Sequence, residues 1–374
     1  ESGQKSLDGD TAFVLHDTYG FPIDLTLEMA EEAGLGVDHE RFHALMSEQR
    51  DRAKQDARTK RSQLADTSVY REFRSLGETV FVGYDELWNQ SGVIGLIKDG
   101  VSVSDASAGE RVEVILAETA LYPESGGQVA DRGVLRADGL EADVLDVQRP
   151  VPGLISHTVT ITTGGIHVGQ VVSVEVDSAN RYRARQAHSA THLVHAALRD
   201  TLGPNATQAG SLNRAGYLRL DFTWNKGVSE QSRIEIEEIA NRAIEDDLEV
   251  TTRVLPIDEA RSMGAMALFG EKYGDVVRMV DIGGPWSREL CAGTHVQSSS
   301  QVGVINLAHE SSVSAGSRRV EAFVGLDALG EFSRERELVQ RLQSTLKAPR
   351  EEVAGRVDDL IAQVRDLEKT IERL

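Results

Sequence analysis

The sequence has very little of what marks a secreted, disulfide-bonded or membrane protein. Its 374 residues include one cysteine, Cys291, so no disulfide can form within the chain. No apolar run approaches the roughly 20 residues that span a bilayer. The first residues, Glu1–Lys5, show neither an initiator Met nor the basic-then-apolar pattern of a signal peptide. We therefore expect a cytoplasmic protein without membrane contact, excised from a longer chain, whose cysteine is a packing residue, a nucleophile or a metal ligand.

Basic residues are outnumbered by acidic ones, with 40 Lys and Arg against 60 Asp and Glu, so the formal net charge is −20. A polyanion is repelled by such a mean field, which argues against indiscriminate nucleic-acid binding. Local cationic stretches remain possible RNA contacts, or they are solvated helix surfaces, and both interpretations stay open. The basic residues gather in two places: Arg50, Arg52, Lys54, Arg58, Lys60 and Arg61, and then Arg181, Arg183 and Arg185.

The texture of the sequence changes three times along the chain. Residues 1–75 are highly charged with a thin apolar stripe, which predicts helices. Residues 76–178 hold short β-branched runs separated by pairs such as Asp99-Gly100, which favour a small barrel or sandwich. Residues 179–328 mix strands and helices without a βαβ rhythm, which is typical of an α+β domain. We predict an α+β protein with helices at about 24–33, 39–64, 187–201 and 229–247, and strands at about 79–82, 93–97, 111–116, 171–176, 217–224, 249–255, 276–281, 302–307 and 319–324.

The last segment, 329–374, carries a heptad pattern. Its apolar residues are spaced by alternating steps of four and three, which predicts an amphipathic helix that needs a partner. That partner is either the preceding helix, with Leu338, Leu342 and Leu346, or a second chain through self-association. The seam consists of Val353, Val357, Leu360, Val364, Leu367, Ile371 and Leu374.

Two short motifs carry the residues most suited to chemistry. His188 and His192 stand at i and i+4, so both imidazoles lie over one patch of a helix. Cys291 and His295 repeat that interval, with Gly293 permitting a tight loop between them. Either pair alone is weak evidence, but three nitrogens and one sulfur together suit tetrahedral Zn²⁺. His195 lies on the same helical face, and we expect it to be a packed or hydrogen-bonded neighbour.

The role of such a metal stays open at this point. Four protein ligands are typical of a closed, structural zinc site, whereas three ligands and a water are typical of a catalytic one. A nucleophilic role for Cys291 is disfavoured, since a zinc-bound thiolate is already occupied.

Two further segments contain polar groups next to glycines. Leu121–Gln128 ends a predicted strand with paired glycines, which allow a sharp bend or a close backbone approach to a ligand. Gln208–Ser211, ahead of the strand Tyr217–Phe222, is typical of a polar loop, and a second interpretation is that it presents polar groups at the rim of a pocket.

The order of these motifs resembles that of the alanyl-tRNA synthetases. The helix His188–His195 is similar to the HxxxHLLH helix of that family, with Val194 in place of a Leu. The loop Cys291–His295 has Ala292 where Gly is common, a change too small to affect the metal site. The matching segments are Asp17–Thr26, Tyr122–Asp131 with its Gly-Gly-Gln core, His188–His195, Ala267–Asp275, Glu289–His295 and Gly316–Ala322.

The resemblance implies an editing fragment of that enzyme. Residues 1–75 would end the tRNA-recognition domain, 76–178 would form a small β-barrel, 179–328 a zinc-binding editing core, and 329–374 the start of a helical linker. The implied activity is hydrolysis of Ser-tRNA(Ala) and Gly-tRNA(Ala), with the acceptor end of tRNA(Ala) as partner. The segments for aminoacylation and for the family's C-terminal domain are missing, so we expect no charging of tRNA. The implied site residues are His188, His192, Cys291 and His295 for zinc, Gln208 and Thr191 for catalysis, and Ser125, Gly126, Gly127, Gln128, Arg219 and Asp221 for substrate.

Two other functions remain possible. The zinc ligands could form a structural clip in a tRNA-binding module without hydrolysis, or the chain could be a free-standing trans-editing deacylase. The helical segment before residue 70 and the heptad tail favour the synthetase fragment over the free-standing enzyme.

Overall fold

The computed structural model describes residues 6–17, 23, 26, 30, 35–38, 41–42, 44–46, 67–267, 273–314 and 316–373. The chain divides into two compact units, Glu1–Glu72 and Phe73–Leu374. Several predictions fall wholly or largely outside the described residues: the helices at 24–33 and 39–64, the cationic stretch Arg50–Arg61, and parts of the segments Asp17–Thr26 and Ala267–Asp275.

The first unit contains a helix and a small strand pair. Helix α1 (Gly9–Asp17) begins after Asp8, whose carboxylate accepts from the Thr11 backbone amide at 2.7 Å. Strands β1 (Ser6–Leu7) and β2 (Gly36–Val37) pair in parallel. The helical prediction for this segment did not anticipate these strands. Helix α4 (Ser68–Leu76) follows at the boundary between the units.

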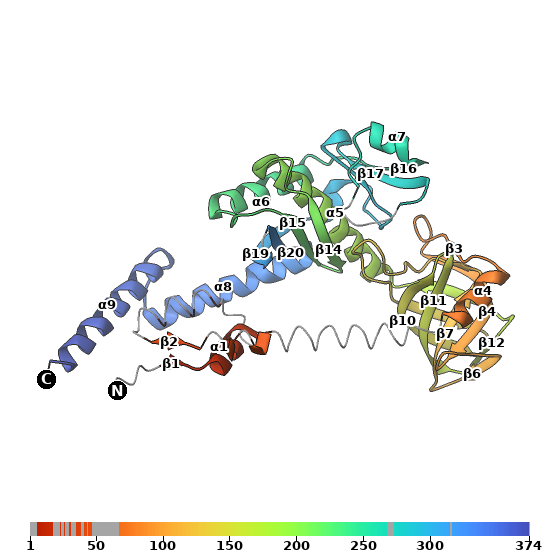
Figure 1. Cartoon of the computed structure of the whole chain (residues 1–374), viewed down its shortest axis with the longest axis horizontal. Coiled ribbons are helices and arrows are strands. Elements are labelled where there is room, and N and C mark those ends of the chain that lie inside the picture. The colour runs from red at the N-terminus through yellow and green to blue at the C-terminus, as the bar shows by residue number, and fades with distance from the viewer. Residues whose placement is uncertain are drawn as a thin grey trace. The chain divides into compact units, whose positions relative to one another are not determined.

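A closed antiparallel barrel opens the second unit (Figure 1). The strand order is β13-β9-β10-β11-β7-β4, and pairing between β13 and β4 closes the ring. Closure decides between the barrel and the sandwich that the sequence left open. A continuous apolar core fills the interior and includes Val114, Leu135 and Ile161. The strands are β4 (Trp88–Lys98), β7 (Arg111–Leu116), β9 (Gly133–Ala137), β10 (Leu140–Val151), β11 (Leu154–Thr163) and β13 (Val171–Val176).

Short strands flank this barrel. Strand β5 (Val101–Val103) pairs with the end of β4. The strands β6 (Asp105–Ser107) and β12 (Gly165–His167) pair with each other, and so do β3 (Val80–Phe81) and β8 (Glu118–Thr119). The predicted strand at 79–82 is therefore confirmed in shortened form.

The next part is a four-stranded antiparallel sheet covered on one face by two helices. Its order is β14 (Gln208–Arg214), β15 (Tyr217–Thr223), β20 (Ser317–Val324) and β19 (Ile305–Ser314). Leu218, Leu220 and Phe222 of β15 pack with apolar residues of α5 (Ser178–Leu202) and α6 (Glu230–Glu245). Gln208–Ser211 was predicted as a loop, which is wrong, because these residues begin β14 and pair with β15.

Helix α5 is longer than predicted. It begins at Ser178 rather than near residue 187, because the Asp177 carboxylate accepts from the Asn180 backbone amide at 3.0 Å and caps the first turn. The predicted helix at 229–247 is confirmed as α6, which Ser229 caps in the same way.

A second, three-stranded sheet carries the Cys291 loop. Strands β16 (Val250–Pro256), β17 (Val276–Ile282) and β18 (Ser287–Leu290) pair in antiparallel order, with α7 (Ile257–Ser262) between the first two in sequence. A short 3₁₀ turn, Ser299–Val302, replaces the start of the strand predicted at 302–307.

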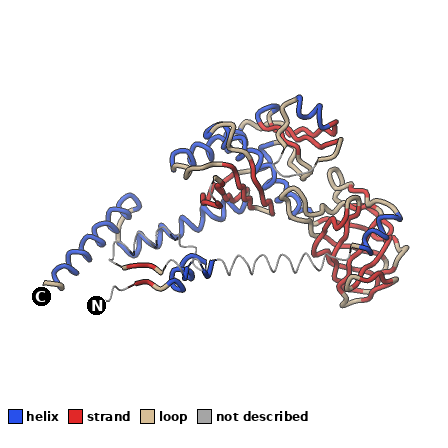
Figure 2. Tube along the Cα trace, in the orientation of Figure 1, coloured by secondary structure: helices blue, strands red, loops and turns tan. Residues whose placement is uncertain are grey.

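The chain continues through α8 (Leu326–Leu346), the 3₁₀ turn Arg350–Glu352 and α9 (Val353–Ile371), shown among the other helices in Figure 2. The predicted heptad helix is thus confirmed as α9. Its apolar side chains Val364 and Leu367 are exposed, and what covers them stays a prediction. No helix within the described residues combines the length and apolarity needed to cross a bilayer. The finer boundaries at residues 178 and 328 also remain predictions.

Candidate metal centre

One face of α5 carries the first pair of predicted ligands. His188, Thr191 and His192 lie on one side of the helix, and His195 extends the row by a turn. Residues 187–198 are all buried. The helix contacts β14, β15 and β18, so this face is directed into the protein.

The second pair lies in the loop after β18, which is held by its carbonyl groups. Arg278 Nη1 donates to the carbonyls of Cys291 and Gly293 at 2.9 and 2.8 Å. The Tyr84 hydroxyl, from the segment between β3 and β4, donates to the carbonyl of Ala292 at 2.7 Å. The guanidinium carbon of Arg278 lies 4.2 Å from the centre of the Tyr84 ring. Three successive carbonyls are therefore fixed by two side chains.

These two pairs converge on one centre. One ligand atom from each of His188, His192, Cys291 and His295 lies within 4.8 Å of the others. Cys291 Sγ is 3.4 Å from His188 Nε2 and 3.3 Å from His295 Nε2. Zinc–sulfur and zinc–nitrogen bonds of ordinary length at a tetrahedral angle place these atoms about 3.5 Å apart. The four side chains can thus hold one metal ion, and the convergence predicted from sequence is confirmed.

Gly293 leaves the space that this arrangement needs. A Cβ at this position would stand 2.0 Å from His188 Cε1 and 2.2 Å from His188 Nδ1. Its backbone lies outside the left-handed region. The glycine is therefore needed for the imidazole of His188 rather than for the turn that the sequence suggested.

The remaining nitrogens of the ligands have partners that orient them. His188 Nδ1 contacts Gln128 Oε1 at 2.8 Å, and His295 Nδ1 contacts Ser189 Oγ at 3.1 Å. Because a carboxamide oxygen only accepts, His188 carries its proton on Nδ1 and leaves Nε2 for a metal. Among the described residues, His192 differs: its Nδ1 is buried without a hydrogen-bond partner, and its Nε2 lies 3.7 Å from Glu289 Oε2. A buried imidazole without a close partner fits a metal ligand.

Burial keeps these imidazoles in the neutral form that binds metals. Burial lowers the pKa of His188 and of His295 well below its usual value, and it also lowers the pKa of His192. Burial would raise the pKa of Glu289, but the imidazoles of His192 and His195 outweigh it and lower that pKa. The site therefore combines neutral imidazoles with one buried carboxylate.

Glu289 and His195 form a second layer around the cluster. His195 Nδ1 contacts Glu289 Oε1 at 2.9 Å, and the backbone amide of Gln208 donates to His195 Nε2 at 3.2 Å. His195 is thus a hydrogen-bonded neighbour of the ligands, as predicted. Glu289 was not predicted as a separate element of the site, and its only signal in the sequence was its place two residues before Cys291.

The Gly-Gly-Gln loop contacts the cluster through one side chain. The segment 121–131 is a loop that follows β8, so the prediction that it ends a strand is wrong. Gly127 has φ +78° and packs so closely on Ser211 that a Cβ would lie 2.1 Å from its Oγ. Its carbonyl accepts from the backbone amide of Asn213 at 2.6 Å. This docking places Gln128 between His188 and Thr294, whose amide donates to Gln128 Oε1 at 2.9 Å.

A group of buried polar side chains lies beside the cluster, between α5 and β14. Thr191 Oγ1 is 2.5 Å from Asn213 Oδ1 and 3.1 Å from the carbonyl of Ala187. Gln208 Nε2 donates to Ser211 Oγ at 3.1 Å. Asn213 is fully buried, yet within the described residues its Nδ2 has no hydrogen-bond partner. Asn213 was not predicted from the sequence.

Two predicted substrate residues lie elsewhere. Arg219 and Asp221 alternate with the core-facing Leu218, Leu220 and Phe222, so they point to the opposite face of the sheet from α5. Asp221 forms a bidentate ion pair with Arg319 at 2.7 and 2.9 Å. The structure does not bring these two residues to the metal cluster.

A buried ion pair joins the barrel to the helix of the ligands. Arg181, in the first turns of α5, contacts Asp131 at the end of the Gly-Gly-Gln loop, and both are almost fully buried. Arg181 also donates to the carbonyls of Gly83 and Ala120 at 2.5 and 2.7 Å. The arginine therefore fixes the loop that carries Gln128 against α5.

Comparison with known proteins finds relatives along the whole chain. Residues 1–180 match the family of tRNA synthetases class II (A), and residues 277–321 match the threonyl and alanyl tRNA synthetase second additional domain. The chain is 59% identical over 369 residues to the alanine–tRNA ligase of Clavibacter michiganensis subsp. michiganensis. It is 58% identical over 372 residues to that of Leifsonia xyli subsp. xyli, and 52% identical over 370 residues to that of Cutibacterium acnes. These matches cover 99–100% of the chain, which spans 41–42% of the length of these relatives.

Proposed function

Because this chain belongs to the alanyl-tRNA synthetase family, we propose that it is the proofreading part of such an enzyme. Its reaction is hydrolysis of the ester that links Ser or Gly to tRNA(Ala). The observation that carries this proposal is the convergence of His188, His192, Cys291 and His295 beside a group of buried polar side chains.

The chemistry of alanine explains why a second site is needed. Alanine differs from glycine by a methyl and from serine by a hydroxyl. A pocket that accepts alanine discriminates against such neighbours by only about 1–3 kcal/mol, or roughly 10- to 200-fold. A hydrolytic site that accepts Ser and Gly but rejects Ala removes the remaining errors.

We assign Zn²⁺ to the cluster on the basis of its donor set. Three imidazoles and one thiolate match the borderline-soft preference of zinc, whereas Mg²⁺ and Ca²⁺ prefer oxygen. A divalent cation, the Cys291 thiolate and the Glu289 carboxylate sum to zero charge, which suits a buried site. When bound, zinc supplies Lewis-acid polarisation of an ester carbonyl and orientation of a ribose oxygen.

The polar group beside the cluster is suited to recognising the aminoacyl moiety. We assign Thr191 and Asn213 to the serine hydroxyl, because the buried Asn213 amide has an unused donor next to the Thr191 hydroxyl. If Asn213 Oδ1 contacts the Thr191 hydroxyl, Asn213 Nδ2 is left for the substrate, and if the amide is flipped, Oδ1 is left instead. We assign Gln208 to the hydrolytic water. Its backbone amide donates to His195 Nε2, and its side-chain amide donates to Ser211 Oγ on the same strand, β14. Rejection of alanine relative to glycine follows from steric exclusion of its methyl.

The partner is tRNA(Ala), and we place its acceptor end at the metal. The Gly-Gly-Gln loop supports the 3′ end through Ser125, Gly126 and Gly127, with Gln128 fixing His188. Basic residues between Arg50 and Arg61 hold phosphates, so charge reversal at Arg52 and Lys54 is expected to weaken tRNA binding and reduce its salt dependence. The cytoplasm is the proposed location.

A structural zinc clip is the competing function. Four ligands in one cluster are typical of closed structural sites, which favours this alternative. Glu289 and the unpartnered Asn213 amide favour hydrolysis, since a clip has no use for an unsatisfied buried donor.

Ester hydrolysis by the purified chain decides between them. The zinc-loaded protein is expected to release Ser from Ser-tRNA(Ala) well above the rate in buffer, and to leave Ala-tRNA(Ala) intact. His188→Ala is expected to abolish this release. If Ser-tRNA(Ala) decays no faster with the folded, zinc-loaded protein than in buffer, a structural zinc clip explains the cluster better than hydrolysis does. Self-association through α9 is a separate proposal, which the molecular mass in solution tests.

A further inference from the structure

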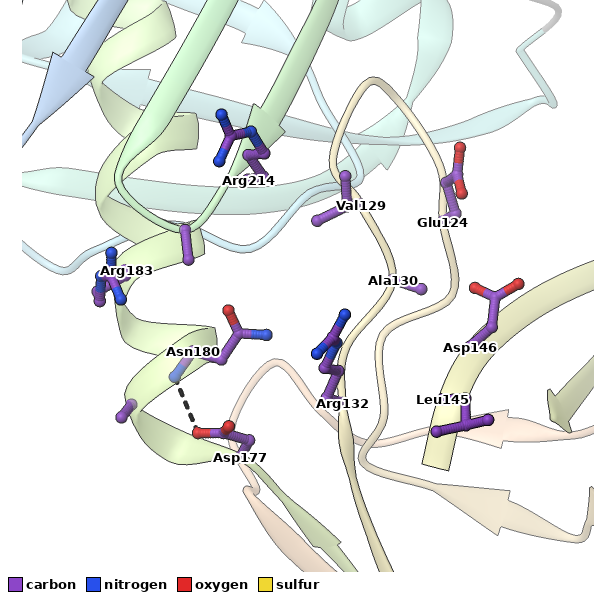
Figure 3. A pocket seen from close by; sticks show the side chains of 12 residues that line it. Glu124, Val129, Ala130, Arg132, Leu145, Asp146, Asp177, Asn180, Arg183 and Arg214 are labelled. Atoms are coloured by element: carbon purple, nitrogen blue, oxygen red, sulfur yellow. Dashed lines mark hydrogen bonds between the residues drawn. The ribbon is translucent and has the colours of Figure 1, made fainter. Parts of the chain in front are cut away.

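A polar pocket lies beside the Gly-Gly-Gln loop, which also contacts the metal cluster through Gln128. Its volume is about 580 Å³, within the range of pockets that hold small ligands. Four parts of the second unit contribute to it: the Gly-Gly-Gln loop and the chain after it, strand β10, the first turns of α5 and the β14–β15 hairpin. Its charged and polar lining includes Glu124, Arg132, Asp146, Asn180, Arg183 and Arg214, all labelled in Figure 3.

The acidic residues of this pocket are already engaged. The Gln148 amide donates to Glu124 at 3.1 Å and to Asp146 at 3.2 Å. The Asp177 carboxylate caps α5 by accepting from the backbone amide of Asn180. These carboxylates therefore have internal uses as hydrogen-bond acceptors.

The basic residues have donors to spare. Within the described part of the chain, neither the Arg132 nor the Arg214 side chain makes a hydrogen bond or an ion pair, and the guanidinium carbon of Arg214 lies 4.3 Å from the centre of the Tyr217 ring. Arg183 is the exception, since it forms an ion pair with Asp327. Figure 3 shows Arg132 and Asn180 pointing toward one another across the pocket. Two arginines with unused donors beside one cavity favour an anion, although the net charge of the chain is −20.

The pocket and the metal cluster share a wall. Val129 and Ala130 line the pocket, while the preceding residue, Gln128, contacts His188 at 2.8 Å. Consecutive Cα atoms are about 3.8 Å apart, so the two sites adjoin along one loop. An RNA strand with its 3′ end at the metal has its next phosphates within reach of this pocket.

We propose that this pocket, through Arg132 and Arg214, binds a backbone phosphate of the RNA strand whose aminoacylated 3′ end is hydrolysed at the metal cluster. The identity of the RNA rests on the proposed editing function, whereas the phosphate contact rests on the pocket itself. Phosphate contacts position a nucleic acid without reading its bases. The pocket therefore sets how the ester is delivered, and the polar group near Asn213 sets which amino acid is removed.

The test compares Arg132→Gln and Arg214→Gln with Arg111→Gln, all in the full chain. Arg111 is an exposed barrel arginine at the start of β7 and does not line the pocket. Arg183 is left unchanged, because its replacement would also break the pair with Asp327. Thermal unfolding of each variant shows whether the fold is retained.

The first readout is binding of uncharged tRNA(Ala) as a function of salt. Each pocket variant is expected to reduce the slope of log affinity against log salt by about 0.7, the value for one phosphate of a single strand. Arg132→Lys is expected to restore the slope, because a charge and not a fixed packing contact is required. Arg111→Gln is expected to keep the wild-type slope.

The second readout is hydrolysis of Ser-tRNA(Ala). The pocket variants are expected to raise KM roughly three- to tenfold, which corresponds to the loss of one hydrogen bond to the tRNA. Their kcat is expected to stay within about twofold of wild type. If wild type is active and both variants match Arg111→Gln in slope and KM, the pocket proposal is wrong and the editing function stands. If wild type is inactive, the editing function fails, and the salt slope alone decides whether the pocket binds phosphate.

Discussion

Replacing Gly293 by Ala tests the metal site by a single methyl group. The added Cβ would lie 2.0 Å from His188 Cε1, whereas ordinary contact begins at 3.4 Å, so the ring must move by about 1.4 Å. Metal–ligand distances tolerate only about 0.2 Å, so His188 is lost as a ligand. We expect zinc affinity to fall by more than about 100-fold, since losing even an outer partner of a ligand costs roughly 10- to 100-fold.

The control is the same substitution where nothing is in the way. Gly330 lies in α8 with no atom within 4 Å of the place that an alanine methyl would take, so Gly330→Ala is expected to stabilise the helix by about 1 kcal/mol and to leave metal binding unchanged. Gly293→Ala is expected to cost about 1–3 kcal/mol through overpacking. Metal content after dialysis, Co²⁺ absorption spectra and denaturant unfolding measure these effects. One tightly held zinc per chain in Gly293→Ala would refute the geometry assigned to His188.

Three other predictions concern the surroundings of the site and the barrel. Gln128→Ala removes the acceptor for His188 Nδ1, and competition with a chelator is expected to show a roughly 10- to 100-fold loss of zinc affinity. Asn213→Ala is expected to lower kcat/KM for Ser-tRNA(Ala) roughly tenfold and that for Gly-tRNA(Ala) much less; equal losses would contradict its assignment to the serine hydroxyl. Burial lowers the pKa of His157 to about 4, so between pH 6.5 and 4 the unfolded chain takes up a proton that the folded chain refuses. The free energy of unfolding should therefore fall by about 3 kcal/mol across that range as pH decreases, and His157→Gln should remove this contribution. Denaturant unfolding of both proteins at several pH values measures it, and parallel pH profiles would show that His157 does not titrate in this way.

Local patterns were enough to predict much of the fold. The runs at 111–116 and 171–176 are confirmed as β7 and β13 at the same bounds, because alternating buried residues and turn glycines define them within the segment itself. The start of α5 was predicted nine residues late, since Ser178–Gln186 carry little apolar signal and the helix depends on the Asp177 cap. The polar stretch Gln208–Ser211 becomes a strand only because β15 lies beside it.

The four candidate metal ligands were predictable from the sequence, and the residues that support them were not. Spacing at i and i+4 marks each pair, and the donor types indicate that the pairs belong together. Tyr84 and Arg278 act on the Cys291 loop from segments more than ten residues away in sequence, through backbone carbonyls that any sequence supplies. Asn213 is recognisable only from its burial and its unpartnered amide. Such partners depend on the folded arrangement, so no pattern within one segment reveals them.

The central claim is that one zinc ion, held by the two distant ligand pairs, serves ester hydrolysis at the end of tRNA(Ala). Stepwise addition of zinc to the metal-free protein, with hydrolysis of Ser-tRNA(Ala) followed at each step, tests it most directly. We expect activity to rise in proportion to added zinc and to level off at one ion per chain, while Ala-tRNA(Ala) persists throughout. Equal hydrolysis by the metal-free, folded protein would contradict it.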